Sequence, residues 1–261
     1  MEHVPVFVAN WKMALSHKAA METLKAIKKL AKDMPDSVEA VVCPSFPSLA
    51  EAASFVGKIS GLQVGAQNVH WEESGAWTGE VAVSQIAPFA SHCIIGHSER
   101  RRLTGETDQQ VAEKAALLIR HGLVPIVCVG ESWEERQAGE TVKRVSEQVE
   151  VLLTKLTRVA LAKLIVTYEP IWAISANNPV APPDPDEVAQ NMLLIRKLAA
   201  GQFGNEAAER LRIIYGGSVD ADNVKQYVGE PGVDGALVGS ASLKPVQFVS
   251  MIKTIGEVGS T

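Results

Sequence analysis

Five short groups of residues in this chain carry chemical groups suited to proton transfer or anion binding, and each follows a short apolar run. They are Asn10 with Lys12, His97 with Glu99, Glu169, Gly216-Gly217-Ser218, and Gly239-Ser240. A carboxylate can take a carbon-bound proton, a neutral imidazole can serve the neighbouring oxygen, and an ammonium can offset the negative charge that develops. Together, these side chains suit proton transfer beside a carbonyl group.

Each of these residues, taken alone, also has an ordinary structural explanation. Lys12 is explained as a solvated lysine, Asn10 as a turn residue, and Glu99 as an ion-pair partner of a neighbouring arginine. His97 is explained as a satisfied surface histidine and Glu169 as a loop carboxylate. Their joint occurrence at corresponding positions of five strand–helix units favours a shared site, because strand ends meet at one rim of an α/β barrel.

The glycine-rich turns predict an anion site. The turns at 216–218 and 239–240 leave backbone N–H groups unpaired, and a short helix beginning near Ser240 would add the positive end of its dipole. Turns after the seventh and eighth strands are the usual phosphate site of α/β barrels. The six histidines show no metal-ligand spacing and no GxGxxG motif follows the first strand, so we expect neither a metal nor a cofactor.

Eight brief apolar runs alternate with segments of helical period. The runs are 5–9, 39–43, 62–66, 93–96, 124–129, 164–168, 212–215 and 235–238. Continuous apolar runs of this length are typical of parallel strands covered on both faces. The alternation predicts an α/β fold, either a closed (β/α)₈ barrel or an open doubly wound sheet. The missing GxGxxG motif favours the barrel, as one domain over 1–261.

Helical stripes follow four of these runs. They lie at 21–31, 111–118, 142–156 and 248–255. Asp184, Pro185 and Glu187 resemble an N-cap, a first helical proline and a capping-box glutamate. Residues 68–80 are loop-like, so the unit after the third strand is expected to be the least regular.

Length and composition fit this fold and exclude other classes. A chain of 261 residues is normal for one α/β barrel. The formal net charge is −5 with no basic tract, so we expect no nucleic-acid partner and no membrane partner. Neither a signal peptide nor a membrane span is found. Cys43, Cys93 and Cys128 lie far apart without a CxxC pair, which favours packed strand thiols and a cytoplasmic protein.

Eight motifs in fixed order are specific enough to indicate a family. They lie at 9–13 (ANWKM), 65–69 (GAQNV), 75–80 (GAWTGE), 96–101 (GHSERR), 125–131, 168–174 (YEPIWAI), 215–219 (YGGSV) and 234–243. Through them the chain resembles the triosephosphate isomerase family nearly end to end. The resemblance implies interconversion of dihydroxyacetone phosphate and D-glyceraldehyde 3-phosphate through an enediolate, a step of glycolysis and gluconeogenesis that uses no cofactor.

The resemblance also implies a role for each site residue. Glu169 is the base and His97 the electrophile, acting as neutral imidazole at a helix N-terminus, as it does in this family. Lys12 stabilises negative charge, Asn10 contacts substrate oxygens, and Glu99 lies beside them. The substrate- and phosphate-binding residues implied by the family are Asn10, Trp11, Lys12, Ser175, Ser218, Gly239 and Ser240.

The chain departs from the family pattern at two places. Residues 170–180 correspond to a lid whose tip usually reads like Gly-Thr-Gly-Lys, but here 175–178 read Ser-Ala-Asn-Asn and Pro179 follows. Ser240 stands where a second glycine is common. The altered lid motivates an alternative, a non-catalytic phosphate-binding barrel. Another sugar-phosphate isomerase on the same barrel is a further alternative.

The resemblance further implies a homodimer. The loop at 70–80 matches one that inserts into the neighbouring subunit, with Thr78 near the partner's site. Trp71 and Trp77 would otherwise be costly exposed apolar surface on this loop. The alternative is that both tryptophans fold back on their own subunit.

Overall fold

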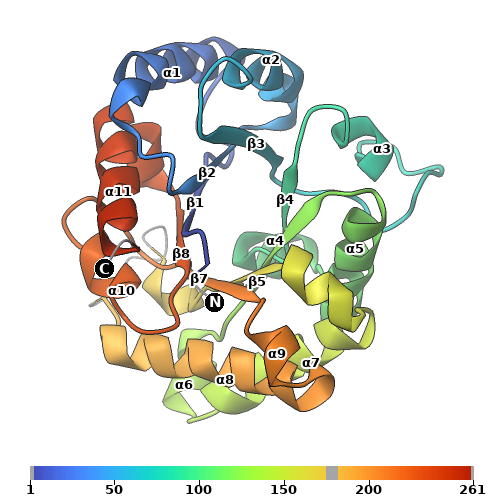
Figure 1. Ribbon diagram of the computed structural model, residues 1–261. Coiled ribbons are helices and arrows are strands. Elements are labelled where there is room, and N and C mark those ends of the chain that lie inside the picture. Colours follow the sequence, from blue (N-terminus) through green and yellow to red (C-terminus); the bar gives the residue numbers. More distant parts are fainter. Residues whose placement is uncertain (1–2, 175–181, 260–261) are drawn as a thin grey trace.

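A closed barrel of eight parallel strands forms the centre of the computed structural model, which describes residues 3–174 and 182–259 (Figure 1). Each strand pairs with its neighbour in sequence, and β8 closes on β1. The strands are β1 (Val6–Asn10), β2 (Glu39–Cys43), β3 (Leu62–Ala66), β4 (His92–Ile95), β5 (Val124–Val129), β6 (Ile165–Tyr168), β7 (Arg212–Tyr215) and β8 (Gly235–Val238). The expected (β/α)₈ barrel is confirmed, and each predicted strand lies within one residue of its observed bounds.

Helices surround the strands on the outside of the barrel (Figure 1). They are α1 (His17–Leu30), α2 (Phe46–Val56), α3 (Val83–Ile86), α4 (Ser98–Thr104), α5 (Asp108–Arg120), α6 (Trp133–Gln137), α7 (Thr141–Thr154), α8 (Pro185–Phe203), α9 (Asn205–Ala208), α10 (Val224–Val228) and α11 (Pro245–Val258). Short 3₁₀ turns add η1 (Ala31–Asp33), η2 (Arg158–Lys163), η3 (Ile171–Ala173) and η5 (Ser240–Leu243). The unit after β3 is the least regular, as expected, because its loop leads only to the single turn of α3.

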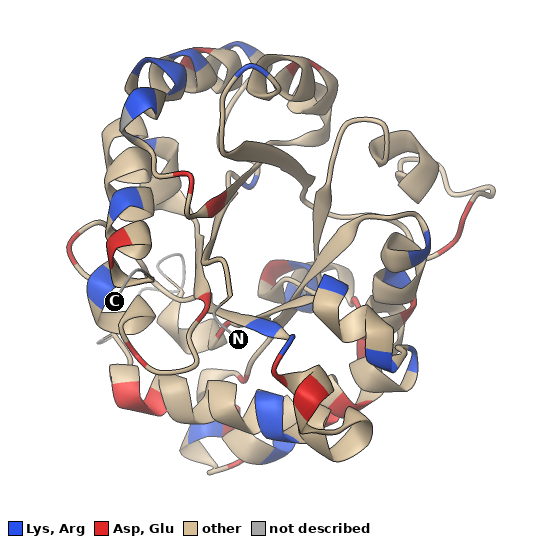
Figure 2. Ribbon diagram, viewed as in Figure 1, with Lys and Arg blue, Asp and Glu red and all other residues tan. Residues whose placement is uncertain are grey.

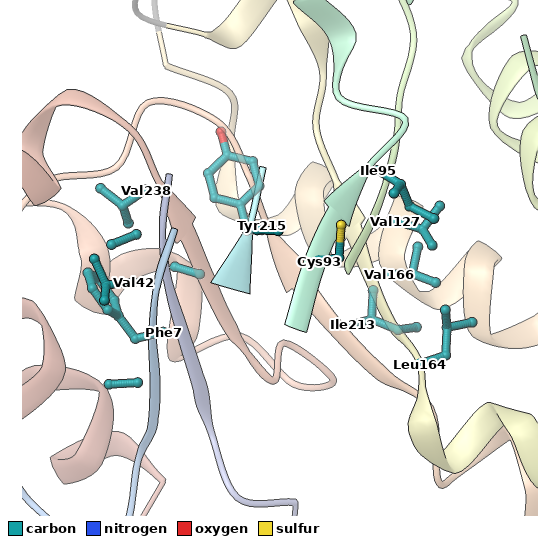
Figure 3. Close-up of a cluster of buried hydrophobic side chains, with 14 of the residues drawn as sticks. Phe7, Val42, Cys93, Ile95, Val127, Leu164, Val166, Ile213, Tyr215 and Val238 are labelled. Atoms are coloured by element: carbon teal, nitrogen blue, oxygen red, sulfur yellow. The ribbon is translucent and has the colours of Figure 1, made fainter. Parts of the chain in front are cut away.

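Strand side chains alternate between two apolar cores. Val6 and Val8 belong to a cluster inside the barrel, whereas Phe7 and Ala9 pack in the larger cluster between the strands and the helices. Phe7 meets Phe248 of α11 edge to face, with ring centroids 5.2 Å apart. Figure 3 shows Phe7 with other members of the larger cluster, among them Val42 and Val238. Burial on both faces explains why these strands read as continuous apolar runs. Cys43, Cys93 and Cys128 are buried free thiols within β2, β4 and β5.

Charged residues lie mainly on the outer helices and loops, with both signs present (Figure 2). Within the described ranges, no helix combines the length and apolarity needed to span a bilayer.

The start of α8 confirms one capping prediction and corrects another. The Asp184 side chain accepts a hydrogen bond from the Asp186 amide, and Pro185 opens the helix, as the sequence indicates. Glu187 does not act as a capping-box residue. Its carboxylate instead accepts hydrogen bonds from two guanidinium nitrogens of Arg136 in α6. A bidentate charged pair of this kind is stronger than a hydrogen bond to one neutral amide.

A polar cluster closes the amino-terminal end of the barrel. Glu39, His92 and Arg212 open β2, β4 and β7 and share the inward alternation of Val41, Ile94 and Ile214. The Glu39 carboxylate lies 2.9 Å from His92 Nε2 and pairs with Arg212. Burial raises the pKa of Glu39, but the His92 hydrogen bond and the Arg212 charge outweigh burial and lower that pKa to about 2.

We therefore predict that Glu39 stabilises the fold above pH 4.5 and that this contribution is lost as the pH falls toward 2. The reason is that the folded-state pKa lies below the unfolded value of 4.5. Glu39→Gln should lower the free energy of unfolding at pH 7 by up to about 3 kcal/mol, from ~1.4 kcal/mol per pKa unit. Urea unfolding at pH 7 and pH 3 measures this.

The matched control is Glu51→Gln, since Glu51 forms an exposed pair with His17. The control should be within about 0.5 kcal/mol of wild type. Equal stability of Glu39→Gln and wild type at pH 7 would contradict the assignment.

Candidate active site

The carboxyl ends of the strands bring distant parts of the chain around one cavity of about 340 Å³. Its lining comprises Asn10, Trp11, Lys12, Ala14, His97, Glu99, Glu169, Ile174, Gly216, Gly217, Val219, Leu237, Gly239, Ser240 and Leu243. These residues come from the ends of β1, β4, β6, β7 and β8 or the loops that follow. Barrel closure therefore joins the polar groups that the sequence separates.

Lys12 is held in a strained backbone conformation. Its φ of 48° lies in the left-handed region, and it is the one non-glycine residue of the described segments with positive φ. The Asn10 side chain accepts from the Lys12 amide at 3.0 Å, and Gln67 Nε2 donates to the Lys12 carbonyl at 2.9 Å. Strain of this kind persists where neighbours fix the backbone, and it is common at functional sites.

The Lys12 ammonium rests against Glu99. Nζ donates to Glu99 Oε1 at 2.7 Å, and both side chains remain partly accessible from the cavity. Glu99 Oε2 lies 3.8 Å from His97 Nδ1, so Glu99 stands between the ammonium and the imidazole. A partly hydrated pair such as Lys12–Glu99 is weak enough to rearrange around an incoming anion.

The local structure around α4 fixes the tautomer of His97. His97 is the N-cap of α4, and its Nδ1 accepts a hydrogen bond from the Glu99 amide at 3.2 Å. Because Nδ1 is the acceptor, the ring proton lies on Nε2. His97 thus presents an Nε2–H donor to the cavity.

Glu169 is buried and meets His97 directly. Its Oε1 lies 2.9 Å from His97 Nε2, and its Oε2 accepts from the Ser98 amide at 3.0 Å. Burial raises the pKa of Glu169, but attraction to His97, these two hydrogen bonds and the Lys12 charge outweigh burial and leave the pKa below its usual value. Glu169 is therefore a carboxylate at neutral pH, ready to accept a proton.

Two glycines allow the backbone of Glu169 to reach this position. A Cβ on Gly130 would lie 2.1 Å from the Glu169 carbonyl oxygen, so only glycine fits at the end of β5. A Cβ on Gly216 would lie 2.5 Å from Thr167 Cγ2 and 3.4 Å from Glu169 Cβ. Close backbone approach, rather than turn formation, explains these glycines.

The predicted phosphate-binding residues divide into three groups. Gly239 and Ser240 line the cavity, where Ser240 opens η5 and the first amides of that turn lack intrahelical acceptors. Ser218 is not part of the lining, because its amide and hydroxyl both donate to the Ala173 carbonyl, at 2.9 and 2.6 Å. Ser175, like the lid tip at 175–178 and Pro179, lies outside the described residues.

Several lining and supporting residues were not singled out in the sequence analysis. Gln67 and Ser98 each lie inside a family-like motif, which was the available signal, but their roles depend on contacts with Lys12 and Glu169. Ile174, Val219 and Leu237 are ordinary apolar residues in sequence and give the cavity its apolar wall. In the described segments, no group of three or more His, Cys, Asp or Glu side chains is placed to hold a metal ion.

The loop between β3 and α3 projects from the side of the barrel (Figure 1). Trp71 and Trp77 both pack against His70, with ring centroids 4.0 and 4.6 Å apart. The folded-back alternative therefore holds for Trp71, which is half-buried, but Trp77 remains 44% exposed and Thr78 is exposed beside it.

The site thus combines a buried carboxylate, an N–H donor at 2.9 Å from it, and an ammonium on the same cavity wall. The carboxylate can accept a proton from carbon while the imidazole donates to an adjacent oxygen. The ammonium and the α4 terminus can stabilise the resulting negative charge. These groups are the ones that an isomerase acting through an enediolate requires.

Comparison with known proteins gives one consistent family. The family model described as triosephosphate isomerase matches residues 5–255. Curated proteins named triosephosphate isomerase are 43% identical from Citrifermentans bemidjiense, 39% from Dictyoglomus thermophilum and 41% from Clostridium botulinum. Each alignment covers 95% of this chain and 98% of the relative.

We predict that His97 is observed as a neutral ring with its proton on Nε2. In ¹⁵N-labelled protein at pH 7.5, NMR should show a pyrrole-type Nε2 and a pyridine-type Nδ1, because Nδ1 accepts the Glu99 amide. The His97→Gln variant, which lacks this pair, assigns the signals among the six histidines. Two pyrrole-type nitrogens on His97 would contradict the tautomer.

Proposed function

The chain belongs to the triosephosphate isomerase family, and on that premise we propose that Glu169 and His97 carry its proton transfers. The protein catalyses the reversible isomerisation of dihydroxyacetone phosphate and D-glyceraldehyde 3-phosphate, a reaction of glycolysis. The observation that carries the residue assignment is the 2.9 Å contact between His97 Nε2 and Glu169 Oε1 inside the 340 Å³ cavity.

Substrate enters between the two groups and replaces their mutual hydrogen bond. Glu169 takes a proton from the carbon beside the carbonyl, and the neutral Nε2–H of His97 donates to the carbonyl oxygen. The enediolate that forms carries negative charge next to Lys12, whose ammonium moves from Glu99 toward the substrate. Glu169 then returns the proton to the neighbouring carbon. By way of His97, the hydroxyl proton of the first carbon passes to the former carbonyl oxygen, which completes the isomerisation.

The phosphate group is held at the opposite side of the cavity. Lys12 provides the charge, and the backbone amides of Gly239 and Ser240 provide uncharged donors. Asn10 and Trp11 form the wall between phosphate and carbonyl. Ser218 contributes its amide only when its bond to the Ala173 carbonyl is exchanged, and Ser175 is assigned on the family motif alone.

The alternatives drawn from the sequence find no support. A non-catalytic barrel would have no need to keep Lys12, His97 and Glu169 around one cavity. A volume of about 340 Å³ lies near the lower end of ligand sites, roughly 300–1,000 Å³, which fits a triose rather than a larger sugar.

We further infer a homodimer formed through the loop at 70–80. Met13 is 97% exposed and Trp77 is 44% exposed, and both are large apolar side chains on loops beside the active-site rim. Covering them against a second copy would remove this apolar area from water. The three buried free thiols fit a reducing compartment, which supports the cytoplasm as the location.

Glu169→Gln should lower kcat by at least ~10²-fold, because the amide cannot act as the base. Both triose phosphates are tested as substrates in coupled assays. Glu150→Gln, a change at an exposed position of α7, is the matched control and should keep the wild-type rate. Retention of the full rate by Glu169→Gln would refute its role as base.

Thr78→Arg should shift the protein from dimer toward monomer, because the arginine places a charge in the inferred interface. Light scattering would give a mass near twice the 28.0 kDa chain for wild type and a lower mass for the variant. Val159→Arg, at an exposed position on η2, should remain dimeric. A monomeric wild type at micromolar concentration would overturn the dimer proposal.

A further inference from the structure

A second cavity, of about 1000 Å³, lies beside the active site and is larger than it. It opens between the segments that follow β4, β5 and β6. Its lining comprises Ser98, Arg101, Arg102, Gly130, Ser132, Trp133, Glu134, Glu135, Arg136, Arg144, Gln148, Ile171, Trp172, Pro182, Pro183, Asp184 and Glu187. The reaction as described uses none of these side chains.

The inner wall of this cavity is directly coupled to the base. Ser98 lines the cavity, and its amide holds Glu169 Oε2 at 3.0 Å. Trp172 also lines the cavity, three residues after Glu169, and its Nε1 donates to the buried Glu131 carboxylate at 2.8 Å. A molecule in the cavity therefore touches Ser98, which holds the Glu169 carboxylate directly, and Trp172, which lies three residues further along the chain.

The cavity offers aromatic surfaces and one unused hydrogen-bonding group. Trp133, 44% exposed, and Trp172 have ring centroids 5.8 Å apart at 57° and provide two faces for a flat ring. Pro182 and Pro183 add apolar surface. The Ser98 hydroxyl is buried and has no hydrogen-bond partner among the described residues, and it becomes available to a ligand when the side chain turns toward the cavity.

Charge in the lining favours an uncharged occupant. Four arginines face four acidic side chains, so their formal charges cancel. Arg136 pairs with Glu187 and stacks on Trp172 at 4.2 Å, while Arg101 and Arg144 both pair with Asp108. A charged ligand would lose its hydration and would have to compete for cations that are already paired.

We propose that this cavity is a regulatory site for an uncharged, planar aromatic molecule that carries one hydrogen-bonding group. The ring packs against Trp133 and Trp172, and the polar group reaches the Ser98 hydroxyl. Occupancy displaces Ser98 or Trp172 and so alters the position of Glu169, which lowers kcat without competing for substrate. The kinetic effect rests on the proposed role of Glu169, whereas binding does not.

Three molecules of the same shape test the charge requirement. Benzamide is neutral, benzoate is an anion and benzamidine is a cation. Saturation-transfer NMR on the full-length protein should show benzamide binding with a Kd on the order of 1 mM, as expected for so small a ligand. Benzoate and benzamidine should bind at least ~10-fold more weakly. Equal binding of all three, or no binding of benzamide at 10 mM, would overturn the proposal.

Two variants locate the site, and steady-state kinetics tests regulation. Trp133→Ala should weaken benzamide binding by about 10-fold, consistent with the loss of one aromatic contact. Leu193→Ala, at an exposed apolar position of α8 outside the cavity, should bind as wild type. Both variants should keep the basal rate. Benzamide should reduce the wild-type kcat with KM unchanged.

Competition of benzamide with substrate would place it in the active site and refute the inference. Unchanged benzamide binding by Trp133→Ala would do the same. Binding without any effect on kcat would overturn the regulatory role. An inactive wild-type enzyme that still binds benzamide through Trp133 would instead refute the proposed catalysis and leave the site standing.

Discussion

The site depends on keeping a buried carboxylate ionised beside an imidazole that donates from Nε2. Burial alone opposes the negative charge on Glu169, so the surrounding structure must stabilise the carboxylate with hydrogen-bond donors that do not transfer their protons to it. The β4–α4 turn provides two such donors. The Glu99 amide occupies His97 Nδ1 and so directs the Nε2–H toward Glu169, while the Ser98 amide donates to the other carboxylate oxygen. The start of α4 thus determines the tautomer of His97, stabilises the charge on Glu169 and sets the distance between the two side chains.

The rest of the barrel holds this pair and the ammonium rigidly. Gly130 and Gly216 pack so closely against the end of β6 that neither position has room for a side chain. This close packing fixes the backbone position of Glu169. On the other side, Gln67 and Asn10 hold the strained Lys12 loop. The side-chain pairs Lys12–Glu99 and His97–Glu169 can then each exchange a protein partner for substrate. A rigid backbone keeps the catalytic groups in position, and side-chain pairs that can separate allow the substrate to bind and the product to leave.

Most of the architecture could be predicted because its signals are local. Apolar runs located all eight strands to within a residue, helical period located α1, α5, α7 and α11, and the capping residues located the start of α8. The rim position of Asn10, Lys12, His97, Glu99 and Glu169 followed from barrel closure alone. Pairings between distant segments could not be predicted in this way. Glu187 was expected to cap its own helix, but it forms an ion pair with the guanidinium of Arg136, 51 residues away. Ser218 stays a predicted phosphate-binding residue, and its contacts with the Ala173 carbonyl could not be predicted because they depend on three-dimensional distance.

Isomerisation of dihydroxyacetone phosphate in D₂O, followed by proton NMR of the products, tests most directly whether a protein base carries the proton. A proton held on Glu169 exchanges with solvent before it returns to carbon. The account predicts deuterium at C2 of the D-glyceraldehyde 3-phosphate formed. Conversion at the full rate with no deuterium on any carbon would mean that hydrogen passes directly between carbons, and would contradict it.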